Sequence, residues 1–190
     1  MSKFMTMNLK PFLSSTVICA AAVLAIVPNG ASAATQGSLG ATSTGTVTIN
    51  ASVANRVQLT GLADVNFTAQ DPFTAATDSQ DVCVWSNTAT KAYTITASGN
   101  GALNAFTLVN GGGATVPYSV AWSASTGAAT GTTLVTGAPS ATLTSTATHP
   151  TCQSGGDSAS LIVGISDTNL QTMQPTVNYT GILTLLVTPQ

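Results

Sequence analysis

The chain has 190 residues, of which 44% are hydrophobic and only 5% are charged, and its formal net charge is −2. Globular domains carry about 25% charged residues, so this chain has to build its polar surface from hydroxyl and amide groups. The scarcity of Lys and Arg excludes a nucleic-acid-binding protein, because phosphates need clustered cations. The apolar content excludes a charged disordered chain, and the lack of Glu together with so little Lys excludes a helical bundle.

The first 33 residues have the pattern of a secretory signal peptide. Lys3 and Lys10 precede an apolar run over residues 17–27, which is too short to span a bilayer. The small residues Ala31-Ser-Ala33 then predict cleavage after Ala33. We therefore expect a secreted protein that is released or attached non-covalently, with no stable insertion in a membrane.

Two cysteines, Cys83 and Cys152, remain after this cleavage. In an oxidising compartment they permit a single pairing, which would close a loop of about 70 residues and stabilise the fold by roughly 4 kcal/mol. Two free thiols are the weaker alternative for a secreted protein. The expected mature chain also keeps only two cations, Arg56 and Lys91, against six aspartates.

The mature chain begins with a polar lead and a segment of alternating pattern. Residues 34–44 are small and Gly-rich, which predicts a flexible lead. From residue 46 the period becomes two, since Val47, Ile49, Ala51 and Val53 are apolar and the residues between them are polar. This alternation indicates a β-strand with one apolar face.

Strand patterns continue along the rest of the chain, and turn-forming Gly, Asn and Pro separate them. No window of a dozen residues after the signal peptide shows helical periodicity. Short strands with regular turns in about 150 residues predict an all-β sandwich. Runs rich in β-branched and aromatic residues predict strands over 57–59, 82–85, 92–97, 105–109, 116–122, 132–135, 141–144, 159–165 and 182–188.

Candidate catalytic and metal-binding residues are few. His149 is the only histidine and lies in a Thr-rich loop, and no serine stands in a Gly-x-Ser-x-Gly context, so a solvated histidine is favoured over a catalytic triad. Asp78 and Asp81 are too sparse for a calcium loop, and six aspartates without Glu make a glycosidase pair a weak hypothesis. The sequence thus predicts no enzyme, no metal and no cofactor.

Four aromatic residues allow two interpretations, a sugar-stacking platform or part of the core. They are Trp85, Tyr93, Tyr118 and Trp122, and each lies in a run predicted as a strand. Their in-register neighbours are apolar, and this favours the core.

Three segments resemble pilin subunits of chaperone–usher fimbriae. The segment Val47–Val53 (VTINASV) resembles the N-terminal segment of these pilins, and Val116–Trp122 (VPYSVAW) resembles a strand in the middle of their domain. The segment Tyr179–Pro189 is similar to the final strand of the colonisation-factor class and of archaic, spore-coat-U-like pilins. The cysteine pair at 83 and 152 departs from both classes, so the subclass stays open.

The resemblance implies an incomplete immunoglobulin-like β-sandwich that is completed by donor-strand exchange. In that family the subunit lacks its last strand; a periplasmic chaperone fills the gap first, and the N-terminal extension of the next subunit replaces it at the outer-membrane usher. The implied partners are therefore identical or related pilin subunits, the chaperone and the usher. The implied donor-strand residues are Val47, Ile49, Ala51 and Val53, and those of the final strand are Tyr179, Leu183, Leu185 and Val187.

We therefore expect a signal peptide (1–33), a flexible extension with the donor strand (34–53) and a pilin domain (54–190). The favoured function is a structural subunit of a bacterial surface pilus that supports adhesion or biofilm formation. One alternative is a secreted β-sandwich that binds carbohydrates or surfaces without polymerising, and a secreted hydrolase is a third. For residues 46–53 the alternative to a donor strand is an ordinary first strand of the chain's own sheet.

Overall fold

The computed structural model describes residues 33–153 and 156–190, so the predicted signal peptide lies outside the described residues except for Ala33. The chain divides into two units between Ser52 and Val53. In the first unit, Thr35 and Thr46 exchange two backbone hydrogen bonds of 2.9 and 3.0 Å. Residues 47–52 form no strand, although their sequence alternates as a strand does.

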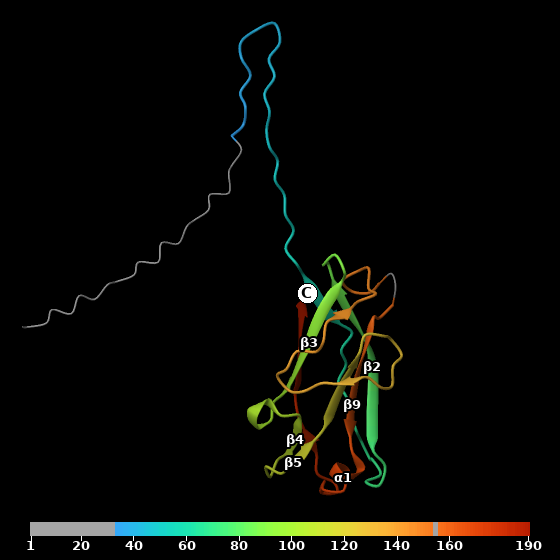
Figure 1. The fold of residues 1–190 in the computed structure, drawn as a ribbon. Helices are drawn as coiled ribbons and strands as arrows, with labels where there is room; N and C mark the ends of the chain where they lie inside the picture. Colours follow the sequence, from blue (N-terminus) through green and yellow to red (C-terminus); the bar gives the residue numbers. More distant parts are fainter. Residues whose placement is uncertain (1–32, 154–155) are drawn as a thin grey trace, which may run out of the picture. The chain divides into compact units, whose positions relative to one another are not determined.

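The second unit confirms the all-β prediction, because it consists of antiparallel sheets with one short α-helix and one 3₁₀ turn (Figure 1). The largest sheet has five strands in the order β1-β2-β9-β6-β7. These strands span Val57–Thr60 (β1), Ala76–Ser86 (β2), Ala159–Ile165 (β9), Ser119–Ser123 (β6) and Thr132–Thr133 (β7).

Two three-stranded sheets complete the unit, in the orders β11-β3-β8 and β10-β4-β5. In Figure 1, β11 is the dark red strand that runs beside β3. The strands span Leu183–Pro189 (β11), Ala92–Gly99 (β3), Leu143–Thr144 (β8), Tyr179–Thr180 (β10), Thr107–Asn110 (β4) and Thr115–Pro117 (β5).

The core lies between the five-stranded sheet and the β11-β3-β8 sheet. Val82 and Val84 of β2 and Ile95 of β3 are fully buried in one apolar cluster. A buried hydrogen bond of 3.1 Å, from the Trp122 indole N–H on β6 to the Tyr93 hydroxyl on β3, also joins the two layers. Such a bond satisfies both polar groups at the centre of the sandwich, where an unpaired group is costly.

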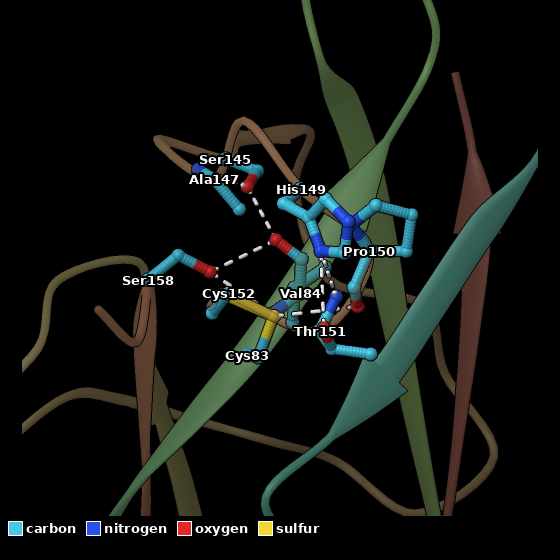
Figure 2. The surroundings of a disulfide bond; sticks show 9 residues. All are labelled: Cys83, Val84, Ser145, Ala147, His149, Pro150, Thr151, Cys152 and Ser158. Carbon is cyan, nitrogen blue, oxygen red and sulfur yellow. Dashed lines mark hydrogen bonds between the residues drawn. A yellow bond between two sulfur atoms is a disulfide. The ribbon is translucent and has the colours of Figure 1, made fainter. Parts of the chain in front are cut away.

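Buried serines take the place of a strand beside the end of β2. The ladder between β2 and β9 ends at Val82 and Ala159. Beyond it, the Ser158 hydroxyl bonds both the N–H and the C=O of Val84 at 2.9 Å, and Ser145 donates to the same carbonyl (Figure 2). These side chains satisfy backbone groups that would otherwise be buried without partners.

Several elements differ from the sequence prediction. The predicted strand 116–122 is two strands, since β5 pairs with β4 while β6 pairs with β9. The first half of β2, Ala76–Asp81, escaped prediction because it is polar, yet it pairs with all of β9 except Ala159. The helix α1, Asp167–Leu170, was also missed; it begins at Ser166, whose hydroxyl accepts the Asn169 N–H.

Candidate functional site

The final strand β11 lies at the edge of its sheet. It pairs with β3 along its full length, from Leu183 opposite Gly99 to Pro189 opposite Tyr93. On its other side it approaches β1, but no ladder joins the two strands in the part of the chain that the structure describes. An unpaired edge of this kind can accept a further strand.

The hydrogen-bond pattern of β11 shows which backbone groups face this edge. Asn100 N–H donates to Ile182 O at 3.1 Å, and Gln190 N–H donates to Ala92 O at 3.0 Å. Because bonded pairs alternate in an antiparallel ladder, the even-numbered residues of β11 bond to β3. The N–H and C=O groups of Leu183, Leu185 and Val187 therefore point to the free edge.

The side chains of the same three residues are only half-buried. Leu183, Leu185 and Val187 pack against the core cluster, yet each keeps part of its surface exposed. On the neighbouring strand β3, the inward side chains of Tyr93 and Ile95 are fully buried. The core is thus less well covered along β11 than along β3, and a strand added to the free edge would cover it.

Pro189 limits the length of backbone that the free edge offers. It belongs to the odd-numbered set but has no N–H, so it donates nothing to an added strand. The usable run is therefore Leu183–Val187. Lys91 lies outside the strands, in the residue before β3. Pro189 directly follows the run 182–188 that the sequence predicts as a strand, so the sequence already carried a signal for the end of the usable edge.

Tyr179, the other residue assigned to the final strand, lies on the separate strand β10. It pairs with Asn110 of β4, and its ring packs partly buried against the core. Its hydroxyl accepts the Gln174 N–H at 3.1 Å, which closes the loop before β10. Tyr179 therefore does not share the free edge with Leu183, Leu185 and Val187.

The predicted donor residues are exposed in the structure. The exposed fractions are 75% for Val47, 88% for Ile49 and 83% for Val53, and Ala51 is also exposed. Large apolar side chains at alternate positions form one face of an extended segment. This face offers apolar groups at the spacing that a strand edge accepts.

The structure contains the disulfide predicted from the sequence, between Cys83 on β2 and Cys152 in the loop before β9 (Figure 2). The two cysteines are 69 residues apart, and both are buried with Ala147 in a small cluster on the outer face of β2. The bond fixes this loop against the sheet, with Trp85 packed half-buried beside it.

The aromatic residues divide between core and surface. Tyr93, Tyr118 and Trp122 are buried in the main cluster, as the sequence favoured, whereas Trp85 is half-buried on the outer face. Burial raises the pKa of Tyr93 and of Tyr118 above the usual value of a phenol. In Tyr93 the bond from Trp122 opposes this rise.

The described residues hold no clustered metal ligands, and the single histidine of the chain lies at the surface. His149 is exposed, and its Nδ1 contacts the hydroxyl and the N–H of Thr151 at 3.0 and 3.3 Å. Residues 33–153 and 156–190 contain no cluster of three or more His, Cys, Asp or Glu side chains that could hold a metal ion. The same residues include no helix long and apolar enough to span a membrane.

Asp81 has a structural role on β2, opposite Ser160 at the start of β9. Its carboxylate accepts the Ser160 hydroxyl and the Gly127 N–H, each at 2.6 Å. These bonds, that of Ser160 first, lower the pKa of Asp81 below its usual value. Ser160 also donates to Ser125 O, so the group ties the loop after β6 to β9.

Comparison with known proteins finds similarity among solved structures alone. No family model matches the chain, and no curated protein matches it. Among solved structures, the fold is similar to a chain of a chaperone–tip adhesin complex studied for the biogenesis of CFA/I fimbriae. The TM-score is 0.48 and the identity 14%, and the match covers 72% of this chain and 41% of the other.

Proposed function

We propose that this protein is a structural, non-enzymatic subunit of a bacterial surface pilus, and that it polymerises by donor-strand exchange. One observation carries the proposal: the inward side chains of β11 are half-buried at a free strand edge, beside a fully buried β3. A strand added there would receive hydrogen bonds from the three backbone positions that face the edge, and would cover Leu183, Leu185 and Val187.

The proposed donor is the segment Thr46–Val53 of a second copy. Its exposed apolar face, with Val47, Ile49, Ala51 and Val53, matches the period of β11. A shift of one residue would turn the Thr and Ser face inward, so the register should be strict. Covering a Val or Ile side chain stabilises the pair by about 1.5–3 kcal/mol.

The domain organisation and partners follow from the same proposal. Residues 1–33 would be the signal peptide, 34–53 the extension and 54–190 the domain that receives the donor. A periplasmic chaperone would occupy the β11 edge before assembly at an outer-membrane usher, because an exposed apolar edge invites aggregation. The assembled fibre would lie on the cell surface and serve adhesion or biofilm formation.

A peptide experiment tests the donor and acceptor roles separately. A variant that lacks residues 34–53 is mixed with a synthetic peptide of residues 44–54. At a peptide concentration of about 100 times the dissociation constant, binding should add about 2.7 kcal/mol of stability. For a domain of this size we expect the melting temperature to rise by about 10 °C, measured by circular dichroism.

Two peptides with one added charge each control for composition. Ile49→Asp places a carboxylate on the apolar face and should abolish the rise, because a buried unpaired charge is costly. Thr48→Asp places the same carboxylate on the polar face and should keep most of it. The proposal fails if both peptides act alike, or if the truncated domain stays unfolded at every peptide concentration.

The intact chain gives a second readout. A polymer held by inserted strands should run as a ladder of oligomers in detergent without heating, and as a monomer after heating. A protein that runs as a monomer in both conditions would contradict the proposal and favour a module that does not polymerise.

A further inference from the structure

A hollow of about 540 Å³ lies on the outer face of the five-stranded sheet, near the start of β1. It is lined by Arg56, Val57, Gln58, Trp85 and Pro150. This set combines a cation, an amide and an aromatic ring. Neither the proposed polymerisation nor the core makes use of this combination.

The strand ladder and the disulfide loop position three of these residues. Gln58 and Trp85 stand directly opposite each other on β1 and β2. They share the outer face, because the alternate residues Val57 and Leu59 pack against the core. The indole of Trp85 packs on the disulfide cluster but stays partly exposed, and Pro150 belongs to the loop that the disulfide holds. The ring is therefore both accessible and fixed in place.

Asn87 fixes the backbone of Arg56. The Asn87 side-chain oxygen accepts the Arg56 N–H at 2.6 Å, and the Asn87 N–H donates to Arg56 O at 3.1 Å. The Asn87 amide nitrogen also donates to Ala54 O at 2.9 Å. Asn87 directly follows β2, so these bonds hold the loop before β1 against the end of β2 at the backbone of Arg56.

The Arg56 side chain is exposed, and no carboxylate in residues 33–153 and 156–190 forms an ion pair with it. The described residues contain six aspartates and only one other cation, Lys91. An arginine without an ion pair that lines the same hollow as an aromatic residue is therefore a distinctive feature of this acidic chain, and it favours an anionic ligand.

We propose that this hollow binds a carboxylated sugar, of the uronic or sialic acid type. The Arg56 guanidinium presents a planar fork that pairs with a carboxylate through two hydrogen bonds. The apolar face of a pyranose ring packs on the Trp85 indole, which offers a large flat apolar surface. The Gln58 amide donates to and accepts from the ring hydroxyls.

This site is separate from the edge proposed for polymerisation. The hollow is lined by residues of β1, of β2 and of the loops beside them, whereas an added strand would bond the backbone of β11, which approaches β1 from the other sheet. Sugar binding and strand addition are measured with different ligands, so the failure of one can be told from the failure of the other.

Titration with sodium glucuronate, with methyl glucoside as the neutral comparator, tests the site on the full secreted chain. The chain has two tryptophans, and Trp122 is only 2% exposed. A ligand added from solution can therefore contact Trp85 alone, and a saturable change in tryptophan fluorescence reports on that residue. Because glucuronate is a small ligand with few contacts, the expected dissociation constant is about 1 mM. Methyl glucoside should bind at least about 10-fold more weakly, because it lacks the carboxylate.

Two matched variants separate the site from overall charge. Arg56→Gln should weaken glucuronate binding about 10-fold or more, whereas Lys91→Gln removes the same charge elsewhere and should change it less than about twofold. Melting curves of both variants check that the fold is intact. The proposal is overturned if glucuronate gives no saturable change up to about 50 mM, if methyl glucoside binds equally well, or if the two variants have the same effect.

Discussion

The strands β3 and β11 are neighbours in one antiparallel sheet and have similar alternating sequences, yet their inward side chains differ in burial. On β3, Ile95 is fully buried between neighbours on both sides. On β11, Leu185 faces the same core but stays partly exposed, because β11 has a paired neighbour on one side only. The difference shows that burial depends on the neighbours of a strand as much as on its own pattern.

The largest loss of stability that we expect comes from removing the disulfide, which holds the loop before β9 against β2. Cys83→Ser with Cys152→Ser should lower the free energy of unfolding by about 4 kcal/mol, because a loop of 69 residues becomes free in the unfolded chain. Urea unfolding with and without reductant measures it. Equal stability of the double variant and the oxidised protein would contradict the prediction.

A matched pair of truncations measures the contrast between β3 and β11 directly. Ile95→Ala should cost about 2–5 kcal/mol, since the residue is fully buried. Leu185→Ala should cost about 1 kcal/mol in the domain without a donor, because it loses less buried surface. Adding the peptide of residues 44–54 should enlarge the Leu185 cost and leave the Ile95 cost unchanged. Urea denaturation gives both values, and equal costs in both states would remove the contrast.

The two buried tyrosines should respond in opposite ways to the loss of the hydroxyl. Tyr93→Phe leaves the Trp122 N–H without its partner and should cost about 1–3 kcal/mol. The Tyr118 hydroxyl is buried and has no hydrogen-bond partner within the residues that the structure describes. Tyr118→Phe should therefore be neutral or stabilising. Thermal melts compare the two, and a larger loss for Tyr118→Phe would indicate an unseen partner of its hydroxyl.

The smallest effect concerns pH. The hydrogen bonds from Ser160 and Gly127 lower the pKa of Asp81 in the folded state below its usual value of about 4. Its contribution to stability is therefore complete above about pH 4 and is lost as the pH falls through the lowered pKa. Asp81→Asn should flatten this loss at acidic pH. Parallel acid titrations, followed by circular dichroism, check this; identical acid curves for wild type and variant would contradict it.

The strand β9 and the region around β5 and β6 show how far the sequence pattern reaches. The sequence over 159–165 predicted β9 with its correct bounds. This strand is central in its sheet, and nearly all of its side chains are buried, so its apolar pattern is unusually clear. The run 116–122 predicted one strand, but the chain changes sheets at Tyr118. The alternation of apolar and polar residues continues through Tyr118, so it gives no sign that the chain leaves one sheet and joins another.

For the candidate sites, the sequence predicted which residues alternate but not where they lie. The resemblance to pilins assigned Tyr179, Leu183, Leu185 and Val187 to the final strand, but Tyr179 lies on β10, and the free edge beside the other three follows from the pairing of β11 with β3. The sequence placed Trp85 with the other aromatic residues in the core. The structure leaves Trp85 half-buried on the outer face, beside Arg56.

The sequence by itself determined the all-β class and the pairing of Cys83 with Cys152. Local alternation encodes strands, and only these two cysteines remain beyond the predicted signal peptide. Only the tertiary structure decided which strand lies at an edge and which aromatic ring reaches the surface. Both depend on contacts between segments far apart in the chain, and alternation along a single segment carries no information about its neighbours.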